Sequence, residues 1–195
     1  MSAGKKNEAV LVSLHELSPV MRECLAEGQE VVLTVTGNSM SPILRHGRDQ
    51  VVLVQATDPA ALQAGDVPLY QRRNGRFVLH RIVERDDGHS RYRWHDAEVL
   101  PSAHVGAGVQ YTMLGDAQTD LEPGIRPEQI VAVAKAFYIK GKLWECASRR
   151  YQRRLKRWHR LLPMRPLLVW LGHLPYRIPH IPARLRREIK KLFAR

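Results

Sequence analysis

Short extended runs separated by turn residues fill the chain between residues 31 and 138, and this spacing constrains the fold more than any other feature. Runs rich in β-branched and apolar residues are predicted as strands. Asn74-Gly75 is a typical hairpin turn, and Asp86-Asp87-Gly88 indicates a second turn. Many short strands joined in this way favour a coiled, mostly antiparallel β-barrel or sandwich. The predicted strands are 31–36, 50–55, 67–72, 76–84, 91–94, 110–114 and 132–138.

Helical patterns flank this β region on both sides. Residues 1–30 are predicted as a helical leader that ends at Gly28. Within the β region, one helical turn is predicted at 128–130. The resulting organisation is a leader (1–30), a β domain (31–142) and a basic amphipathic helical tail (143–195). The tail is predicted from apolar residues at helical spacing, namely Trp144, Tyr151, Leu155, Trp158 and Leu162.

The net charge of +12 is concentrated in the tail. Residues 148–195 contain 15 Lys and Arg against a single acid, which gives +14, whereas residues 1–147 carry −2. A basic segment with tryptophans is typical of a helix lying on an anionic membrane surface. One alternative is a helix that packs its apolar stripe on the domain; nucleic-acid binding is the less favoured one. The residues predicted to contact the membrane are Trp158, Trp170, Arg153, Arg154 and Arg157.

Composition argues against several other classes of protein. A hydrophobic content of 44% is ordinary for a globular chain. No apolar run approaches the length of about 18 residues that a spanning helix needs, and the N-terminus lacks the apolar core of a signal peptide. We therefore expect a cytoplasmic protein, peripheral on the cytoplasmic face of the membrane. Cys24 and Cys146 form no disulfide framework, the histidines lack metal-like spacing, and neither metal nor cofactor is expected.

Three residues suggest nucleophilic catalysis. Ser39 follows a predicted strand and the strand-breaking pair Gly37-Asn38, so its hydroxyl is expected clear of the sheet. His80 interrupts an apolar strand, and Asp116 follows another strand after Gly115. Serine, histidine and aspartate together can activate a hydroxyl for attack on an acyl carbon. Singly, each residue is more common in a turn or in packing; their order and flanking residues carry the prediction.

The surrounding motifs resemble those of the signal peptidase and LexA-like serine peptidase superfamily. The segment 37–47, Gly-Asn-Ser-Met-Ser-Pro-Ile-Leu-Arg-His-Gly, is similar to its nucleophile motif, and 65–67, Gly-Asp-Val, opens the next strand as in that family. Leu79-His80-Arg81-Ile82 resembles the base strand of the histidine-type branch, found in the endoplasmic reticulum and archaea. The segment 115–118, Gly-Asp-Ala-Gln, is similar to a late glycine-aspartate-asparagine box. The resemblance covers residues 31–139 and implies a coiled β-fold with the active site along one edge.

The resemblance implies a Ser39 nucleophile, a His80 base and an Asp116 that orients the imidazole, with Asp120 as an alternative acid. The chain departs from the family at Asn38, where the residue before the nucleophile is usually glycine, and residues 1–30 are not expected to form the N-terminal membrane anchor typical of the family. The Ser39 N–H or the Asn38 amide is then expected to bind the oxyanion. Met40 is expected to help position the substrate.

The predicted function is that of a serine endopeptidase that cleaves a leader or precursor peptide at a membrane surface. The alternative is a catalytically degenerate peptide-binding or scaffold protein recruited to a membrane, or to nucleic acid, by its basic tail. A self-cleaving LexA-like repressor is less favoured, because no lysine occupies the base position. If the tail served only in recruitment, removing it would leave cleavage of a soluble peptide intact. Arg81 is expected to form an ion pair with an acid of the domain.

Overall fold

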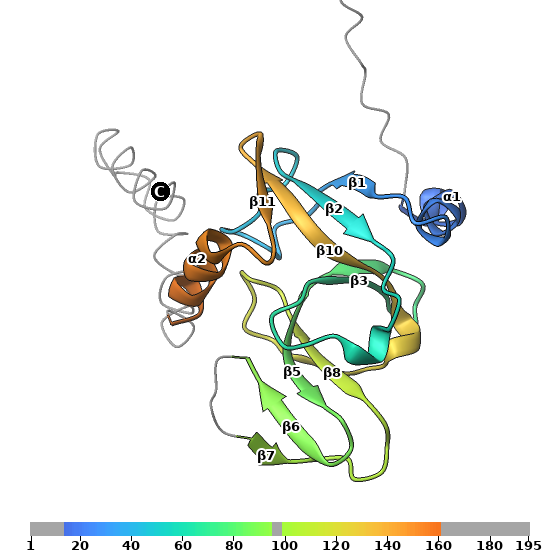
Figure 1. Ribbon diagram of the computed structural model, residues 1–195, viewed down its shortest axis with the longest axis vertical. Helices are drawn as coiled ribbons and strands as arrows, with labels where there is room; N and C mark the ends of the chain where they lie inside the picture. Colours follow the sequence, from blue (N-terminus) through green and yellow to red (C-terminus); the bar gives the residue numbers. More distant parts are fainter. Residues whose placement is uncertain (1–13, 95–98, 161–195) are drawn as a thin grey trace, which may run out of the picture.

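The computed structural model describes residues 14–94 and 99–160, and in these residues the protein is mainly β (Figure 1). Two antiparallel sheets make up the body, and a helix lies at each end of the described chain. These helices are α1 (Leu14–Ala26) and α2 (Arg149–Arg160), and two short 3-10 helices, η1 (Pro59–Ala61) and η2 (Pro127–Gln129), connect strands.

The first sheet carries the predicted nucleophile region at one of its edges. Its strands follow the spatial order β1-β2-β10-β3-β4, and β11 pairs with part of β10. β1 and β4 are therefore edge strands with unpaired backbone groups on their outer sides. Their bounds are β1 (Val31–Thr34), β2 (Gln50–Val54), β3 (Pro68–Gln71), β4 (Phe77–Leu79), β10 (Ile130–Ile139) and β11 (Lys142–Glu145).

The second sheet packs beside the first and extends away from it as a long hairpin (Figure 1). Its spatial order is β7-β6-β5-β8-β9. The bounds are β5 (Arg81–Asp86), β6 (Ser90–Arg93), β7 (Val99–Pro101), β8 (Gln110–Leu114) and β9 (Glu122–Ile125). All its pairs are antiparallel, as are those of the first sheet.

The prediction of a mainly antiparallel β-fold is confirmed, with one informative difference. The predicted strand 76–84 is two strands, β4 in the first sheet and β5 in the second, with His80 between them. The chain changes sheets at that residue, so His80 belongs to neither ladder. The sequence did not predict three of the strands, β7, β9 and β11. β7 and β9 contain proline, which is unusual within strands, and β11 lies inside the region predicted as the tail.

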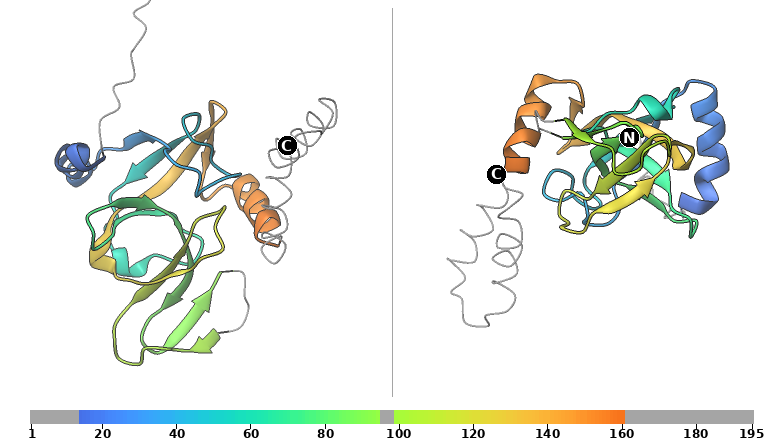
Figure 2. Two further views of the ribbon diagram at one scale, coloured as in Figure 1. Left: turned by 180° about the vertical axis from the view of Figure 1, so that it is seen from behind. Right: turned by 90° about the horizontal axis from the view of Figure 1, so that it is seen from below.

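The start of the basic tail is part of the domain. Tyr151 and Leu155 of α2 are 1% and 0% exposed, and they belong to the same core cluster as Phe137 of β10. Trp158 packs against that cluster and donates its indole N–H to the Asp116 carbonyl at 2.9 Å. The indole of Trp158, which is predicted to contact a membrane, is thus partly buried against the domain. α1 and α2 lie on opposite sides of the strands (Figure 2).

The leader helix ends where the sequence predicted. The Gly28 N–H donates to the Leu25 carbonyl at 3.0 Å, and Gly28 has φ of +77°, a conformation that favours glycine at a helix end. Met21 and Leu25 bury the inner face of α1 in the core. Within residues 14–94 and 99–160, no helix is long and apolar enough to cross a membrane. Trp170 and the rest of the predicted tail lie outside the described residues.

Candidate active site

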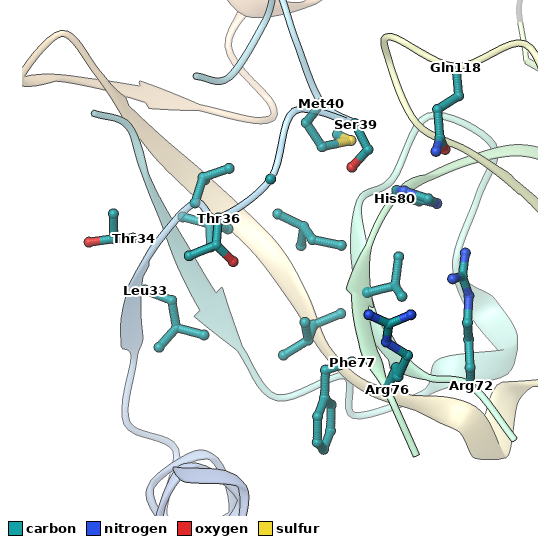
Figure 3. Close-up of a pocket in the computed structure, with 16 residues that line it drawn as sticks. Leu33, Thr34, Thr36, Ser39, Met40, Arg72, Arg76, Phe77, His80 and Gln118 are labelled. Carbon is teal, nitrogen blue, oxygen red and sulfur yellow. The ribbon is translucent and has the colours of Figure 1, made fainter. Parts of the chain in front are cut away.

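A cavity of about 390 Å³ separates the two edge strands of the first sheet, and both Ser39 and His80 line it. Leu33 and Val35 form one wall, and residues 76–80 form the other. Figure 3 shows the Ser39 hydroxyl, the His80 imidazole and the Gln118 side-chain amide directed toward the same space. The structure thus brings together the predicted nucleophile and the predicted base, which are 41 positions apart in the sequence.

The loop that carries Ser39 is held at several points. Gly37, with φ of +83°, turns the chain after β1, and its N–H donates to His46 Nδ1 at 2.9 Å. Met40 and Leu44 anchor the loop in the core, where they are 2% and 0% exposed. The Ser39 carbonyl accepts a hydrogen bond from the Ala117 N–H at 2.7 Å. This last bond attaches the serine to the turn that contains Asp116.

The far end of this loop is fixed by a buried carboxylate. Asp49 is 0% exposed and accepts hydrogen bonds from the backbone N–H groups of Arg45 and Lys140, at 2.8 and 3.1 Å. The Arg48 guanidinium also pairs with it at 2.7 Å. Burial opposes ionisation of Asp49, but these donors offset it, and its pKa lies below the ordinary value. Arg48 therefore supplies the charge partner of Asp49.

His80 is almost fully buried, with 4% of its surface exposed, and its contacts come from β3 and β9. His80 Nδ1 lies 3.4 Å from the Tyr70 hydroxyl and 3.9 Å from Glu122 Oε2. The Tyr70 hydroxyl donates to Glu122 Oε2 at 2.6 Å. Arg72 holds the same carboxylate with two hydrogen bonds, at 2.7 and 2.6 Å. Glu122, from a strand that the sequence did not predict, is thus the acid beside the histidine.

These contacts select one tautomer of His80. Burial opposes ionisation of Glu122, but the hydrogen bonds from Arg72 and Tyr70 hold its pKa below the ordinary value, so Glu122 is an anion near neutral pH. The single hydroxyl proton of Tyr70 points to that anion, and the Tyr70 oxygen can only accept from His80. His80 then carries its proton on Nδ1, and Nε2 is left as the basic nitrogen.

The environment of His80 also favours its neutral form. Burial lowers the pKa of His80 to about 4, and the positive charge of Arg72 adds to this, whereas the carboxylates of Glu122 and Asp116 act in the opposite direction. A neutral imidazole is the form that can accept a proton from a hydroxyl. The ordinary histidine pKa is about 6.5, so the histidine here stays a base well into the acid range.

This shift predicts the acid limb of any His80-dependent reaction. We expect kcat/KM to rise with pH around a midpoint near 4 and to be level by about pH 6. Between about pH 4 and the ordinary histidine pKa of about 6.5, the unfolded chain binds a proton at His80 that the folded chain does not. Stability therefore falls as pH drops through that window. Titration of the His80 ring by NMR measures its pKa in the folded protein, and the pH–rate profile shows whether activity follows it. A midpoint at about 6.5 or above in either measurement would contradict the role of a buried, neutral His80.

Asp116, the predicted third catalytic residue, has a different set of contacts. Its two carboxylate oxygens accept from Arg81 Nε and Nη2 at 3.0 and 2.8 Å, and both side chains are buried. Arg81 also donates to the Gly65 carbonyl and to the Tyr151 hydroxyl, and its guanidinium stacks over Trp94 at 5.0 Å. The ion pair expected for Arg81 is present, with Asp116 as the acid. The carboxylate beside His80 Nδ1 is Glu122.

The other predicted site residues have varied positions. Met40 lines the cavity next to Ser39 and is 2% exposed. Asn38 is exposed, and its backbone carbonyl accepts a hydrogen bond from the Ser41 N–H in a turn. Asn38 is not among the residues that line the cavity. Asp120 is exposed and is also not part of that lining. Gln118 instead brings an amide to the cavity, which the sequence did not predict.

The position of Gly115, in the turn before Gln118, has no space for a side chain. A Cβ atom added to Gly115 would lie 2.8 Å from the Ser39 carbonyl oxygen and 2.6 Å from Gln118 Oε1. The family-like glycine is thus explained by the close approach of two loops. Its absence of a side chain allows the Ala117 N–H to reach Ser39.

Among residues 14–94 and 99–160, no group of three or more His, Cys, Asp or Glu side chains is arranged to hold a metal ion. His46, His89 and His104 are exposed, and His95 lies outside the described residues. Comparison with models of protein families gives no match, and a search of curated proteins finds no similar sequence.

Proposed function

We propose that the protein is a serine endopeptidase of the signal peptidase-like type, with Ser39 as nucleophile and His80 as general base. The observation that carries this proposal is the shared cavity, in which a serine hydroxyl faces a buried histidine whose tautomer leaves Nε2 basic. An anionic carboxylate beside the other ring nitrogen completes the set of groups that a serine nucleophile needs. In this proposal Glu122 replaces Asp116 as the third residue.

The reaction proceeds through an acyl-enzyme. Ser39 Oγ attacks the carbonyl carbon of the scissile peptide bond while His80 Nε2 takes the hydroxyl proton. Glu122, acting through Tyr70, stabilises the imidazolium that forms. His80 then gives that proton to the leaving amine as the C–N bond breaks. A water molecule, deprotonated by His80, hydrolyses the ester and restores the serine.

The oxyanion of the tetrahedral intermediate needs hydrogen-bond donors close to Ser39. We assign this role to the Ser39 N–H and to the Gln118 side-chain amide, which faces the same space in Figure 3. The peptide would bind in an extended form along the cavity, where β1 and β4 both present free edges. The apolar walls favour small, uncharged side chains near the scissile bond.

The proposal is tested with purified wild-type and Ser39→Ala protein, a panel of leader-bearing precursor peptides and mass spectrometry of the new N-termini. New N-termini that appear only with the wild type would support a serine endopeptidase and give its site preference. Binding of peptides by both proteins, without cleavage by either, would overturn the proposal in favour of a peptide-binding protein on a peptidase-like fold.

The tautomer argument makes a prediction for Tyr70. Tyr70→Phe removes the hydroxyl that connects His80 to Glu122, so the imidazole loses its fixed orientation. We expect kcat to fall by about tenfold or more, a part of the 10² to 10⁴ that general-base catalysis contributes. Steady-state kinetics on one peptide substrate measures this effect.

The matched control for this variant is Tyr111→Phe. Tyr111 is also fully buried in the core cluster that contains Tyr70, but its hydroxyl donates to the Pro59 carbonyl at 2.7 Å, away from the cavity. Both variants lose one buried hydroxyl, so they should lose similar stability. Equal rates for the two variants would contradict a role of Tyr70 in catalysis.

We further propose that the exposed face of α2 holds the protein at an anionic membrane surface. Arg153 and Arg157 are exposed on this helix, while its apolar residues face the core. Arg154 and Arg150 stack over Trp144, which leaves a cationic ridge on the outside of the domain. Each basic residue near the surface contributes on the order of 1 kcal/mol to binding.

Vesicle co-sedimentation tests the membrane proposal. Arg153→Gln/Arg157→Gln should weaken binding to vesicles that contain phosphatidylserine, and raised salt should have the same effect. Arg91→Gln/Arg93→Gln, on the second sheet, is the charge-matched control and should bind as wild type. Equal loss with both pairs would indicate a diffuse charge effect and contradict a specific role of α2.

A further inference from the structure

Two arginine side chains line one end of the cavity beside Ser39. Its lining contains two arginines, Arg72 and Arg76, and no aspartate or glutamate. Both arginines belong to the β3–β4 hairpin, where the Arg72 N–H donates to the Arg76 carbonyl at 2.9 Å. Figure 3 shows both side chains reaching up this strand pair in the direction of His80.

The two arginines differ in how their charge is balanced. Arg72 forms a two-point ion pair with Glu122, so its charge is largely used within the protein. Arg76 is exposed, and within residues 14–94 and 99–160 no acidic side chain pairs with its guanidinium. Its positive charge is therefore available to a ligand in the cavity.

Strand geometry sets an upper limit on the distance between this charge and His80. Arg76, Val78 and His80 alternate along β4 and its ends, so their side chains point to the same face. Four residues of extended chain span about 13 Å between the Cα atoms of Arg76 and His80. The guanidinium lies closer to His80 than this, because the Arg76 side chain extends toward it (Figure 3). An extended peptide beside β4 covers the same length with about four residues.

We propose that the peptide carries a carboxylate within about four residues of its scissile bond, and that Arg76 binds this group. This inference rests on the proposed function and names the class of its substrate: an extended peptide with an apolar segment at Ser39 and an acidic group at the other end of the cavity. The apolar walls fit the segment between them, and the arginine-lined end complements the acid. An Asp or Glu side chain and a C-terminal carboxylate share this chemistry.

The experiment uses the full-length chain and a set of peptides with one cleavable core. Asp, Asn or Lys is placed two to six residues from the scissile bond on either side, and kcat/KM is measured for each peptide. We expect a preference of about three- to fivefold for Asp over Asn, the upper range for an exposed ion pair, at one position about two to four residues away. The preference should shrink in high salt.

Charge reversal gives the sharper test. Arg76→Glu should invert the preference at that position, so that the Lys peptide becomes better than the Asp peptide. Arg73→Glu is the matched control, because Arg73 lies on the same hairpin and is absent from the cavity lining. It should retain the preference for Asp. Equal inversion by both variants, or no inversion by Arg76→Glu, would overturn the proposal.

Two further arms separate the remaining outcomes. Shortened peptides that end at the preferred position, with a free or an amidated C-terminus, distinguish a terminal carboxylate from an acidic side chain. Fluorescence anisotropy with the Ser39→Ala protein measures the same charge preference in binding, without turnover. Absence of cleavage with a retained charge preference would refute the proposed peptidase alone, whereas cleavage without any charge preference would refute the Arg76 site alone.

Discussion

Replacing Ser39 with alanine is expected to lower kcat by about 10⁴-fold or more, because removal of the nucleophile from a serine–histidine mechanism leaves only binding and oxyanion stabilisation. His80→Ala should have an effect of similar size, since the hydroxyl would lose its base. The double variant should be hardly worse than either single variant, because the two residues act as one unit. Cleavage of a single peptide, followed by mass spectrometry over long incubations, measures rates this low.

Ser41→Ala is the matched control for Ser39→Ala. Ser41 lies two residues along the same loop, and its hydroxyl makes one long contact of 3.4 Å with the Leu44 carbonyl. The Ser41→Ala protein should retain most of the wild-type activity, and its circular dichroism spectrum should match that of the wild type. A Ser39→Ala protein that cleaves as fast as Ser41→Ala would exclude the serine mechanism.

Replacing Asp116 with alanine is expected to reduce the free energy of unfolding by about 3 to 5 kcal/mol, the usual cost of leaving one member of a buried ion pair uncompensated. Arg81 is 0% exposed, and without Asp116 its guanidinium would keep hydrogen bonds to two neutral groups, the Gly65 carbonyl and the Tyr151 hydroxyl. Urea denaturation followed by tryptophan fluorescence measures the loss.

A second substitution shows that the charge is the cause. Arg81→Met in the Asp116→Ala background removes the stranded guanidinium, so the double variant should be more stable than Asp116→Ala alone. Glu122→Gln offers a contrast, because its partner Arg72 is 35% exposed and an exposed pair contributes only about 0 to 1 kcal/mol. That variant should affect kcat more than stability. If Asp116→Ala kept wild-type stability but had a strongly reduced kcat, the result would support the catalytic role that the sequence predicted for Asp116.

The position of α2 changes what truncation can test. The sequence suggested that the tail could be removed without loss of cleavage if it served only in recruitment. Tyr151 and Leu155 are core residues, and the Tyr151 hydroxyl contacts Arg81 at 3.1 Å. A cut before α2 would open the core beneath the turn that holds Ser39. Surface substitutions on α2 are therefore the appropriate way to separate membrane binding from folding.

Local patterns were sufficient for much of the fold. β-branched runs and the turns at Asn74-Gly75 and Asp86-Asp87-Gly88 predicted most strands to within one or two residues, because alternation and turn chemistry act over a few neighbouring residues. The weak strands β7, β9 and β11 were missed. Their residues have low strand preference by themselves and pair only because a neighbouring strand offers a ladder.

The sequence by itself determined the antiparallel β class, the glycine-led turn that presents Ser39, and the candidacy of His80, since each depends on residues adjacent in the chain. Only the tertiary structure decided which acid stands beside the histidine. Asp116 is the nearer candidate by motif, but Arg81 binds its carboxylate in the core, while Glu122 reaches His80 through a cross-sheet contact with Tyr70. Buried charges must find partners wherever folding brings them together, and sequence separation carries no information about that choice.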